Sequence, residues 1–292
     1  ARRRVTDGAI SLADERRVSA ALAPRKSVRP ALSVSLVSHG HGGMLASLLA
    51  DLAIYAETSI EVLLTLNIPE PLPSGMNALP FPVRVQQNEQ PLGFGENHNR
   101  AAALATADAF CVLNPDVAFT ADPFAPMLAA LHDPTIGVVG PAVYGSQGEP
   151  QDHARRFPTV SSLVKKAITG ERPIEYDVKS EPIEPDWIAG LCMAFRAQTF
   201  RKLGGFDTQY FLYYEDVDLC ARARAAGLRI VVDPASRLVH DGCRRSWRNP
   251  YYTAMHLKSM VRFFGADPRR AREPLDTPRR VVHSRRLDDA RA

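Results

Sequence analysis

The chain has 292 residues, a net charge of +4 and an apolar content of 45%. This length suffices for one large α/β domain or two smaller ones, and so mild a charge does not indicate nucleic acid as a partner. No apolar run approaches the roughly 18 residues of a membrane span, and the arginine-rich start lacks the apolar core of a signal peptide. The four cysteines form no C-x-x-C pair. We therefore expect a soluble cytoplasmic protein with reduced thiols and no zinc site.

The first third of the chain predicts alternating strands and helices. Residues 1–30 are charged and alanine-rich and predict an N-terminal extension. A strand at 32–37 then runs into the glycine-rich turn Ser38–Gly43, and a helix follows from Met44 to Tyr55. This geometry binds phosphates or nucleotide bases in many α/β proteins, although an ordinary strand–helix turn explains it equally well. Further strands are expected at 60–66 and 83–85.

A segment rich in glycines and amides follows at residues 88–100. It includes Asn88, Gly93 and Asn99 and opens a helix of alanines at 101–107. Such groups at a helix N-terminus favour a site for a phosphorylated ligand. The alternative is that they only shape a turn.

A central strand is predicted at 109–113, because it is apolar on both faces. It ends in Asn114-Pro115-Asp116. A carboxylate at the end of a buried parallel strand lies where α/β sheets bind ligands, and oxygen ligands suit a hard cation. A turn-forming Asn-Pro-Asp is the competing interpretation. A helix starting at Asp122-Pro123, a strand at 136–140 and a polar segment at 145–185 come next; this segment predicts one helix near 161–168 within a mobile loop.

The most informative stretch runs from residue 187 to residue 224. A strand at 191–195 and a helix at 197–203 precede a run, 206–218, that mixes four acidic residues with five aromatic ones. This mixture predicts carboxylates at the wall of a partly apolar cleft, where one can be tuned to take a proton. Glu215 and Asp216 fall in the first turn of the next helix. They could instead simply cap that helix.

The last third predicts strands at 228–232 and 237–240 and an amphipathic helix at 250–264. His240 ends the second strand and leads into an arginine-containing segment with Arg244. A histidine there is either a hydrogen-bonded core residue or a metal ligand. The basic clusters at both termini are either solvated tails or contacts to anionic lipid headgroups.

Taken in order, these pieces resemble the inverting family 2 glycosyltransferases with a GT-A fold, and within them the rhamnosyltransferase-like enzymes of bacterial cell-surface polysaccharide synthesis. The resemblance covers roughly residues 32–264. The motifs that match are Ser38-His39-Gly40, Asn88 to Asn99, Leu113-Asn114-Pro115-Asp116, Asp186 to Gly190, Gly204-Gly205-Phe206-Asp207, Phe211 to Arg222, and His240 with Ser246.

The resemblance implies an α/β fold: a Rossmann-like central mixed sheet flanked by helices, in a single main domain with a C-terminal helix. It implies an N-terminal extension at 1–30, a glycosyltransferase domain at 31–265 and a basic tail at 266–292. Within the domain, residues 31–118 would bind the nucleotide sugar and residues 119–265 would contain the acceptor and catalytic half.

The resemblance also implies roles for individual residues. Asp216 would be the catalytic base with Glu215 beside it, and Asp116 with His240 would hold Mg²⁺ or Mn²⁺. Trp187 and Gly190 would line the acceptor side. The nucleotide-sugar contacts would be Ser38, Asn88, Gly93, Asn99, Asn114 and Arg244.

The implied function is transfer of a sugar, such as rhamnose, from a nucleoside-diphosphate donor to a glycan- or lipid-linked acceptor, at the cytoplasmic face of the inner membrane. Two departures leave the donor base open: Leu66-Asn67 replaces the usual Asp-Asn, and His39-Gly40 replaces the usual Tyr-Asn. A non-catalytic GT-A domain that binds a nucleotide sugar or glycan is the alternative. A Rossmann dehydrogenase lacks support, because the glycine fingerprint is missing.

Overall fold

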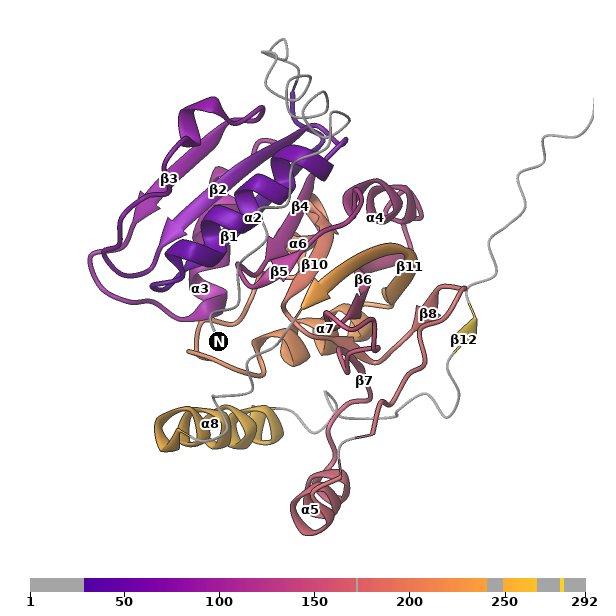
Figure 1. Ribbon diagram of the computed structural model, residues 1–292. Helices are drawn as coiled ribbons and strands as arrows, with labels where there is room; N and C mark the ends of the chain where they lie inside the picture. Colours follow the sequence, from indigo (N-terminus) through magenta and orange to yellow (C-terminus); the bar gives the residue numbers. More distant parts are fainter. Residues whose placement is uncertain (1–28, 172, 241–248, 267–278, 281–292) are drawn as a thin grey trace, which may run out of the picture.

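The computed structural model describes residues 29–171, 173–240, 249–266 and 279–280. A ten-stranded sheet forms the centre, and helices cover both of its faces (Figure 1). The fold is therefore the expected mixed α/β architecture, a single central sheet with a helix, α8, near the C-terminal end. The predicted N-terminal extension and almost all of the predicted basic tail fall outside the described residues.

One half of the sheet is parallel, in the order β3–β2–β1–β4. Its strands alternate between two cores: Leu32, Val34 and Leu36 face one, whereas Phe110 and Val112 face the other. The bounds are β1 (Leu32–Ser38), β2 (Ile60–Leu66), β3 (Val83–Gln87) and β4 (Ala109–Leu113).

The other half is mixed, because β10 runs antiparallel to both β4 and β6. Strand β11 runs parallel to β6 and is long enough to pair with β5 as well. The bounds are β5 (Val117–Ala118), β6 (Ile136–Tyr144), β8 (Ile183–Glu184), β10 (Cys192–Arg196), β11 (Arg229–His240) and β12 (Arg279–Arg280), with β7 (Ala154–Arg155) and β9 (Trp187–Ile188) forming a separate two-stranded sheet.

The helices divide between the two faces according to the two apolar cores. Side chains of α2 (Gly42–Tyr55) and α4 (Phe124–Ala130) enter one core. Those of α3 (Phe94–Leu104), α6 (Ala197–Lys202) and α7 (Glu215–Ala225) enter the other. The remaining helices are η1 (Met76–Ala78), α5 (Val160–Thr169) and α8 (Pro250–Ala266).

Strands β1, β2 and β4 all end at one edge of the sheet, which we call the site edge. Ser38 pairs with Leu66, and Leu36 pairs with Leu113, so the turns that follow these strands come together. Ligands of α/β sheets bind at the carboxyl ends of parallel strands. The site edge is therefore where the predicted functional residues are expected.

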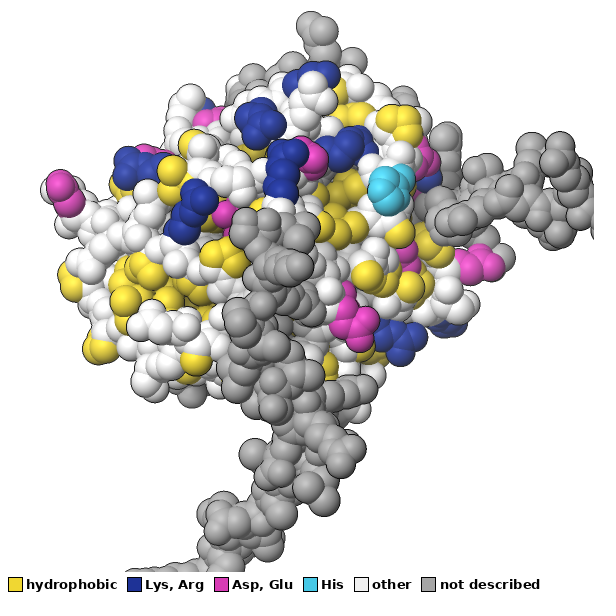
Figure 2. Space-filling model, turned by 90° about the horizontal axis from the view of Figure 1, so that it is seen from above, with side chains coloured by type: hydrophobic (Ala, Val, Ile, Leu, Met, Phe, Trp, Pro, Cys, Tyr) yellow, Lys and Arg dark blue, Asp and Glu magenta, His cyan; other side chains and the backbone are white. Residues whose placement is uncertain are grey.

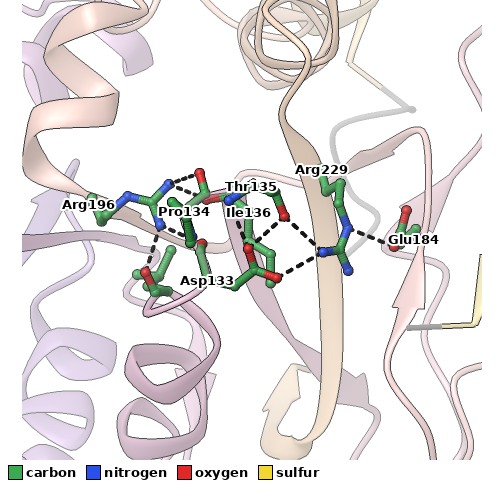
Figure 3. A network of polar contacts seen from close by, with 8 residues as sticks. Asp133, Pro134, Thr135, Ile136, Glu184, Arg196 and Arg229 are labelled. Atoms are coloured by element: carbon green, nitrogen blue, oxygen red, sulfur yellow. Dashed lines mark hydrogen bonds and ion pairs between the residues drawn. The ribbon is translucent and has the colours of Figure 1, made fainter. Parts of the chain in front are cut away.

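The opposite edge contains a network of paired polar groups (Figure 3). Arg196, at the end of β10, donates to four backbone carbonyls of residues 131–136. Arg229, at the start of β11, donates to Asp133 at 3.0 Å, to Thr135 at 2.9 Å and to Glu184 at 2.9 Å. This network joins the turn before β6 to β8, β10 and β11, and we call it the arginine network.

Most predicted elements are confirmed, although several of their bounds differ. Helix α3 begins at Phe94, well before the alanines, because Gly93 and the amides already form its first turn. Helix α4 begins one residue later than predicted, with the Asp122 carboxylate accepting from the N–H of Phe124 at 2.8 Å. The two predicted strands at 228–232 and 237–240 are one strand, β11, with an irregular register between Asp233 and Arg237. Segment 145–185 contains β7, α5 and β8.

Candidate active site

The aromatic run 206–214 turns the chain so that α7 begins at the site edge. Tyr213 and Tyr214 have φ values of 71° and 70°, which side-chain-bearing residues adopt only at a cost of about 1–3 kcal/mol each. Helix α8 offsets that cost: the His256 ring lies 5.3 and 5.2 Å from the two tyrosine rings, and the Ser259 hydroxyl donates to the Leu212 carbonyl at 2.8 Å. Such strain is typical of functional sites.

Asp216 lies in the first turn of α7, as predicted, and is half-buried. One carboxylate oxygen accepts from the N–H of Val217 at 2.8 Å, so the capping interpretation is correct for that oxygen. The other accepts from the N–H of Gly190 at 2.9 Å, outside the helix. Burial raises the pKa of Asp216, while these two N–H groups oppose the rise. The result is a carboxylate of fixed orientation and increased basicity.

Glu215 is buried beside Asp216, and its Oε2 atom has no hydrogen-bond partner. Burial, followed by the negative charge of Asp216, raises the pKa of Glu215 to about 8. Two neighbouring carboxyl groups in unlike surroundings divide the acid and base roles between them. Because backbone N–H groups stabilise the charge on Asp216, Glu215 is the member that holds a proton near neutral pH.

Gly190 and Leu191 connect the start of α7 to the end of β4. The Gly190 N–H binds Asp216, and the Leu191 carbonyl accepts from the N–H of Asn114 at 2.8 Å. A side chain at Gly190 would lie 3.2 Å from the Phe94 ring and 3.6 Å from Asp216. The glycine therefore allows the close approach of α3, α7 and the Asn114 turn.

The second acidic position is Asp116, which β5 and β11 bring next to His240. His240 pairs with Val117, and its Nε2 atom lies 3.2 Å from Asp116 Oδ2. Burial alone would raise the pKa of Asp116, but the hydrogen bond and charge of His240, with a smaller effect of His41, lower it below its usual value. The other oxygen, Oδ1, is buried without a partner.

Asp116 and His240 fit a divalent cation. An unpartnered buried carboxylate oxygen beside an imidazole is a ready pair of ligands, and both residues remain partly open to solvent. The described residues contain no cluster of three or more histidine, cysteine or acidic side chains placed to hold a metal. The protein would thus supply two ligands and leave the remaining positions to the ligand's own oxygens and water, as in sites where a metal binds substrate phosphates.

The predicted nucleotide-sugar residues separate into two groups. Asn88 belongs to an amide network at the end of β2: it donates to Asn67 at 2.9 Å and to Asn97 at 2.7 Å. Ser38 is buried at the end of β1, where its hydroxyl accepts from the N–H of His41 at 3.3 Å. Together with Asn114, these residues lie at the site edge: Ser38 ends β1, Asn88 follows β3 and Asn114 follows β4.

Gly93 and Asn99 instead fix the aromatic run. A side chain at Gly93 would meet the Phe211 carbonyl at 2.7 Å, and the Phe94 N–H donates to that carbonyl at 2.9 Å. The Asn99 amide both donates to and accepts from the backbone of Phe206, at 2.8 and 2.9 Å. Their contacts favour a positioning role over the predicted contact with nucleotide. Arg244 lies outside the described residues.

Trp187, predicted on the acceptor side, is buried, and its ring N–H donates to the Arg156 carbonyl at 2.9 Å. The Arg155 guanidinium lies over the ring, 5.3 Å from its centre, and forms an ion pair with Asp152 at 3.0 Å. The positive charge of Arg155 also lowers the pKa of Asp216. Of Trp187 and Arg155, only Arg155 is therefore partly exposed, and its charge acts on Asp216.

Sequence reasoning missed both Arg155 and His41. Arg155 lies in the polar segment 145–185, and only the pairing of β7 with β9 places it on Trp187. His41 was part of the recognised glycine-rich turn, but nothing in its spacing linked it to Asp116. Only the folded structure reveals either residue, because Arg155 is 32 positions from Trp187 and His41 is 75 positions from Asp116 along the chain.

Comparison with known proteins decides the family to which the chain belongs. The family described as "Glycosyltransferase like family 2" matches residues 77–272. The chain belongs to this family. It is an inverting glycosyltransferase, and the match extends over the Asn88 segment, the Asp116 turn, Glu215, Asp216 and His240. The non-catalytic alternative and the dehydrogenase are therefore set aside.

Two curated relatives sharpen the family assignment. An N-acetylglucosaminyl-diphospho-decaprenol L-rhamnosyltransferase of Mycobacterium tuberculosis is 29% identical over 255 residues, which are 80% of this chain and 83% of the relative. The rhamnosyltransferase WbbL of Escherichia coli K12 is 29% identical over 184 residues, 59% of this chain and 69% of the relative. The resemblance to rhamnosyltransferases noted from the motifs is thus confirmed.

Solved structures confirm the GT-A glycosyltransferase fold. GalNAc-T7, solved with UDP, GalNAc and Mn²⁺, superposes with a TM-score of 0.59 at 20% identity over 81% of this chain and 48% of its own. The mannosyltransferase PcManGT from Pyrobaculum calidifontis, solved with GDP-Man and Mn²⁺, gives 0.53 at 18% identity over 87% of this chain and 72% of its own. At this identity the likeness concerns the fold.

Proposed function

We propose that this glycosyltransferase moves rhamnose from a nucleoside-diphosphate donor to a sugar hydroxyl of an acceptor linked through diphosphate to a lipid. The relatives in Mycobacterium tuberculosis and Escherichia coli both support the sugar, and the first also supports the class of acceptor. The observation on which the site assignment rests is the short backbone connection through Gly190 and Leu191. It places the Asp116 turn and Asp216 at the same edge of one sheet.

In the proposed reaction, the Asp216 carboxylate takes the proton of the acceptor hydroxyl. The acceptor oxygen forms a bond to the anomeric carbon as the bond from that carbon to the phosphate oxygen breaks. The electron pair leaves with the nucleoside diphosphate, and the anomeric configuration inverts. A positioned base of this kind contributes roughly 10²–10⁴-fold. Glu215, protonated and uncharged, keeps the surroundings of Asp216 apolar without adding a second negative charge.

Asp116 and His240 would hold the divalent cation. When bound, the ion supplies positive charge to the diphosphate of the donor. Of Mg²⁺ and Mn²⁺, the imidazole of His240 favours Mn²⁺, because Mg²⁺ prefers oxygen ligands. Ser38, Asn88 and Asn114 would contact the nucleotide sugar from the ends of β1, β3 and β4.

The donor half of the domain would be residues 31–118 and the acceptor half residues 119–265. We place the enzyme in the cytoplasm, at the face of the membrane that contains its lipid-linked acceptor. The free, buried thiols of Cys111, Cys192 and Cys220 support a reducing compartment. Among the described helices, none combines the length and apolar composition that a bilayer crossing requires.

The direct test supplies a panel of nucleoside-diphosphate sugars, including rhamnose, glucose, galactose and mannose, with a diphospholipid-linked N-acetylglucosamine acceptor. Thermal shift first identifies the donor that binds the folded protein. NMR of the product then gives the anomeric configuration, which should be opposite to that of the donor. Donor binding without transfer to this acceptor would contradict the proposed acceptor, and selective use of another sugar would contradict rhamnose.

A further inference from the structure

Helix α5 presents an unusual outer face. Val160, Val164 and Ile168 follow one another at intervals of four residues, so they lie on one side of the helix, and their side chains are 64%, 51% and 79% exposed. Lys165 is exposed next to this row. The helix contains no acidic residue. An apolar row of this kind on a monomer ordinarily has a partner.

Helix α8 repeats the arrangement with a different sequence. Leu257 and Val261, again four residues apart, are 51% and 67% exposed, and Lys258 is exposed beside them. This helix also contains no acidic residue. Its opposite side is buried: Phe263 and Ser259 pack beneath the aromatic run that leads to Glu215. The exposed row therefore does not contribute to the packing of α8 against the rest of the protein.

The two helices lie on the same side of the molecule. Figure 1 shows both below the sheet, with α7 and β7 between them and the sheet. Figure 2 shows the opposite side, seen from above, where apolar, basic and acidic side chains are all present. Both helices on the lower side thus have an exposed apolar row next to a lysine, and neither contains an acidic residue.

From these observations we propose that α5 and α8 together bind the surface of an anionic lipid bilayer. Helices with exposed aliphatic residues flanked by lysines lie in the headgroup region of membranes, where the apolar row enters the acyl boundary. Lysines near anionic headgroups add attraction. Two convex helices suit a flat, deformable surface better than a groove on another protein. We assign this surface to the membrane and not to a second copy of the chain.

This binding would place the catalytic base close to the headgroups. Helix α8 contacts the aromatic run directly, and Arg155 and Trp187 of the acceptor side belong to β7 and β9, on the same side of the sheet as α5. The benefit for catalysis rests on the proposed function, because it requires a lipid-linked acceptor. The membrane contact itself does not.

The experiment is vesicle sedimentation with the full chain. Vesicles of equal parts phosphatidylcholine and phosphatidylglycerol are compared with pure phosphatidylcholine vesicles, without donor, acceptor or metal. Wild type should bind the anionic vesicles. The variants Val164→Glu/Ile168→Glu and Leu257→Glu/Val261→Glu should each reduce the partition coefficient by roughly tenfold or more. Lys165→Gln and Lys258→Gln should each reduce it about fivefold, on anionic vesicles alone.

The matched control is Ile54→Glu, an exposed apolar side chain on α2, which should leave vesicle binding unchanged. Circular dichroism and thermal melting check that each variant is folded. Equal binding of wild type and both glutamate double variants would overturn the proposal. So would a wild-type dimer in solution that the same variants convert to monomer, since the rows would then join two copies.

A further arm separates this proposal from the proposed function. Asp216→Asn should bind vesicles like wild type and lack transfer. The glutamate double variants should retain transfer to a water-soluble acceptor and lose most transfer to an acceptor embedded in anionic vesicles. If vesicle binding follows these variants while no sugar is transferred to any acceptor, the membrane surface stands and the reaction assignment fails.

Discussion

The two edges of the sheet differ in whether the polar atoms of their charged residues are paired. In the arginine network, Arg196 donates to backbone carbonyls of the turn before β6, and Arg229 donates to the carboxylates of Asp133 and Glu184. None of these four charged residues has a buried polar atom without a partner. At the site edge, Asp116 and Glu215 each retain a buried oxygen without a partner. A buried polar atom without a hydrogen bond costs about 1–3 kcal/mol. The first edge therefore stabilises the fold, whereas the second retains unpaired oxygens that the proposed function assigns to a ligand.

This contrast separates residues that look alike in sequence. Asp133 and Asp116 are both aspartates in turns near the end of a strand or helix, and both have a pKa below the usual value. For Asp133 the largest cause is the Thr135 hydroxyl, a partner within its own turn. For Asp116 burial acts the other way, and a histidine 124 residues along the chain outweighs it. The five predictions below test whether this distinction is functional.

The largest effect is expected for Asp216→Asn. An amide keeps the shape of the side chain but cannot take the proton of the acceptor, so transfer should fall by roughly 10²–10⁴-fold. Donor affinity, measured by thermal shift, should be unchanged. Asp133→Asn at the other edge is the control and should retain the turnover of the folded protein. Normal turnover by Asp216→Asn would remove this residue from the role of base.

Removal of the metal site should come next. Asp116→Ala, or an excess of chelator with wild type, should lower transfer by roughly 100-fold, because the diphosphate loses its counter-charge. Mn²⁺ should restore wild type better than Mg²⁺ and should fail to restore Asp116→Ala. Full activity of chelated wild type would exclude a cation held by Asp116 and His240.

Breaking the arginine network should change stability and leave chemistry intact. Arg196→Met leaves four carbonyls without their shared donor, so we expect the free energy of unfolding to fall by about 2–4 kcal/mol. Denaturant unfolding measures this loss. The kcat and the metal dependence of the folded variant should match wild type. A selective loss of kcat with unchanged stability would reverse the roles of the two edges.

The buried acid pair predicts a pH dependence of stability. The pKa of Glu215 is near 8 in the folded protein and near the ordinary 4.5 when unfolded, so the folded state binds the proton more tightly. Stability should be highest below the unfolded pKa and fall as pH rises toward 8, at up to about 1.4 kcal/mol per pH unit. Glu215→Gln should flatten this slope. Asp133→Asn is the contrasting variant. In wild type the depressed pKa of Asp133 contributes stability that is lost only at acidic pH.

The smallest effect is expected for Arg155→Met. The positive charge of Arg155 lowers the pKa of Asp216, so its removal raises that pKa further. The acidic limb of the kcat/KM profile should then move to higher pH. Arg156→Met is the matched control, since the Arg156 guanidinium lies over Tyr176 instead. Equal profiles for both variants would show that Arg155 does not act on the base.

Local pattern was sufficient to predict much of the fold. Strands 60–66 and 109–113 were found with the predicted bounds, because each is a continuous apolar run between polar turns. The prediction of two strands separated at 233–236 was wrong. It was made because Asp233 and Pro234 resemble a turn. The two pieces instead continue along β6 with a shifted register. Pairing with a partner strand, which a single sequence does not display, decided that segment.

The candidate site was predictable in composition and not in arrangement. The mixed acidic and aromatic run located Glu215 and Asp216, because so many carboxylates in an apolar stretch are costly without a function. Nothing in the run indicated that Gly93 and Asn99 fasten it to α3, or that α8 holds the Tyr213–Tyr214 turn. Those contacts span 40 to 120 residues of chain, and only the folded sheet brings them together.

The backbone of Gly190 and Leu191 lies between the base and the Asn114 turn and binds both through main-chain atoms. Peptide groups are planar and keep their dimensions whatever side chains surround them. The separation between Asp216 and the Asn114 turn therefore depends on the main chain of residues 190 and 191 and not on their side chains.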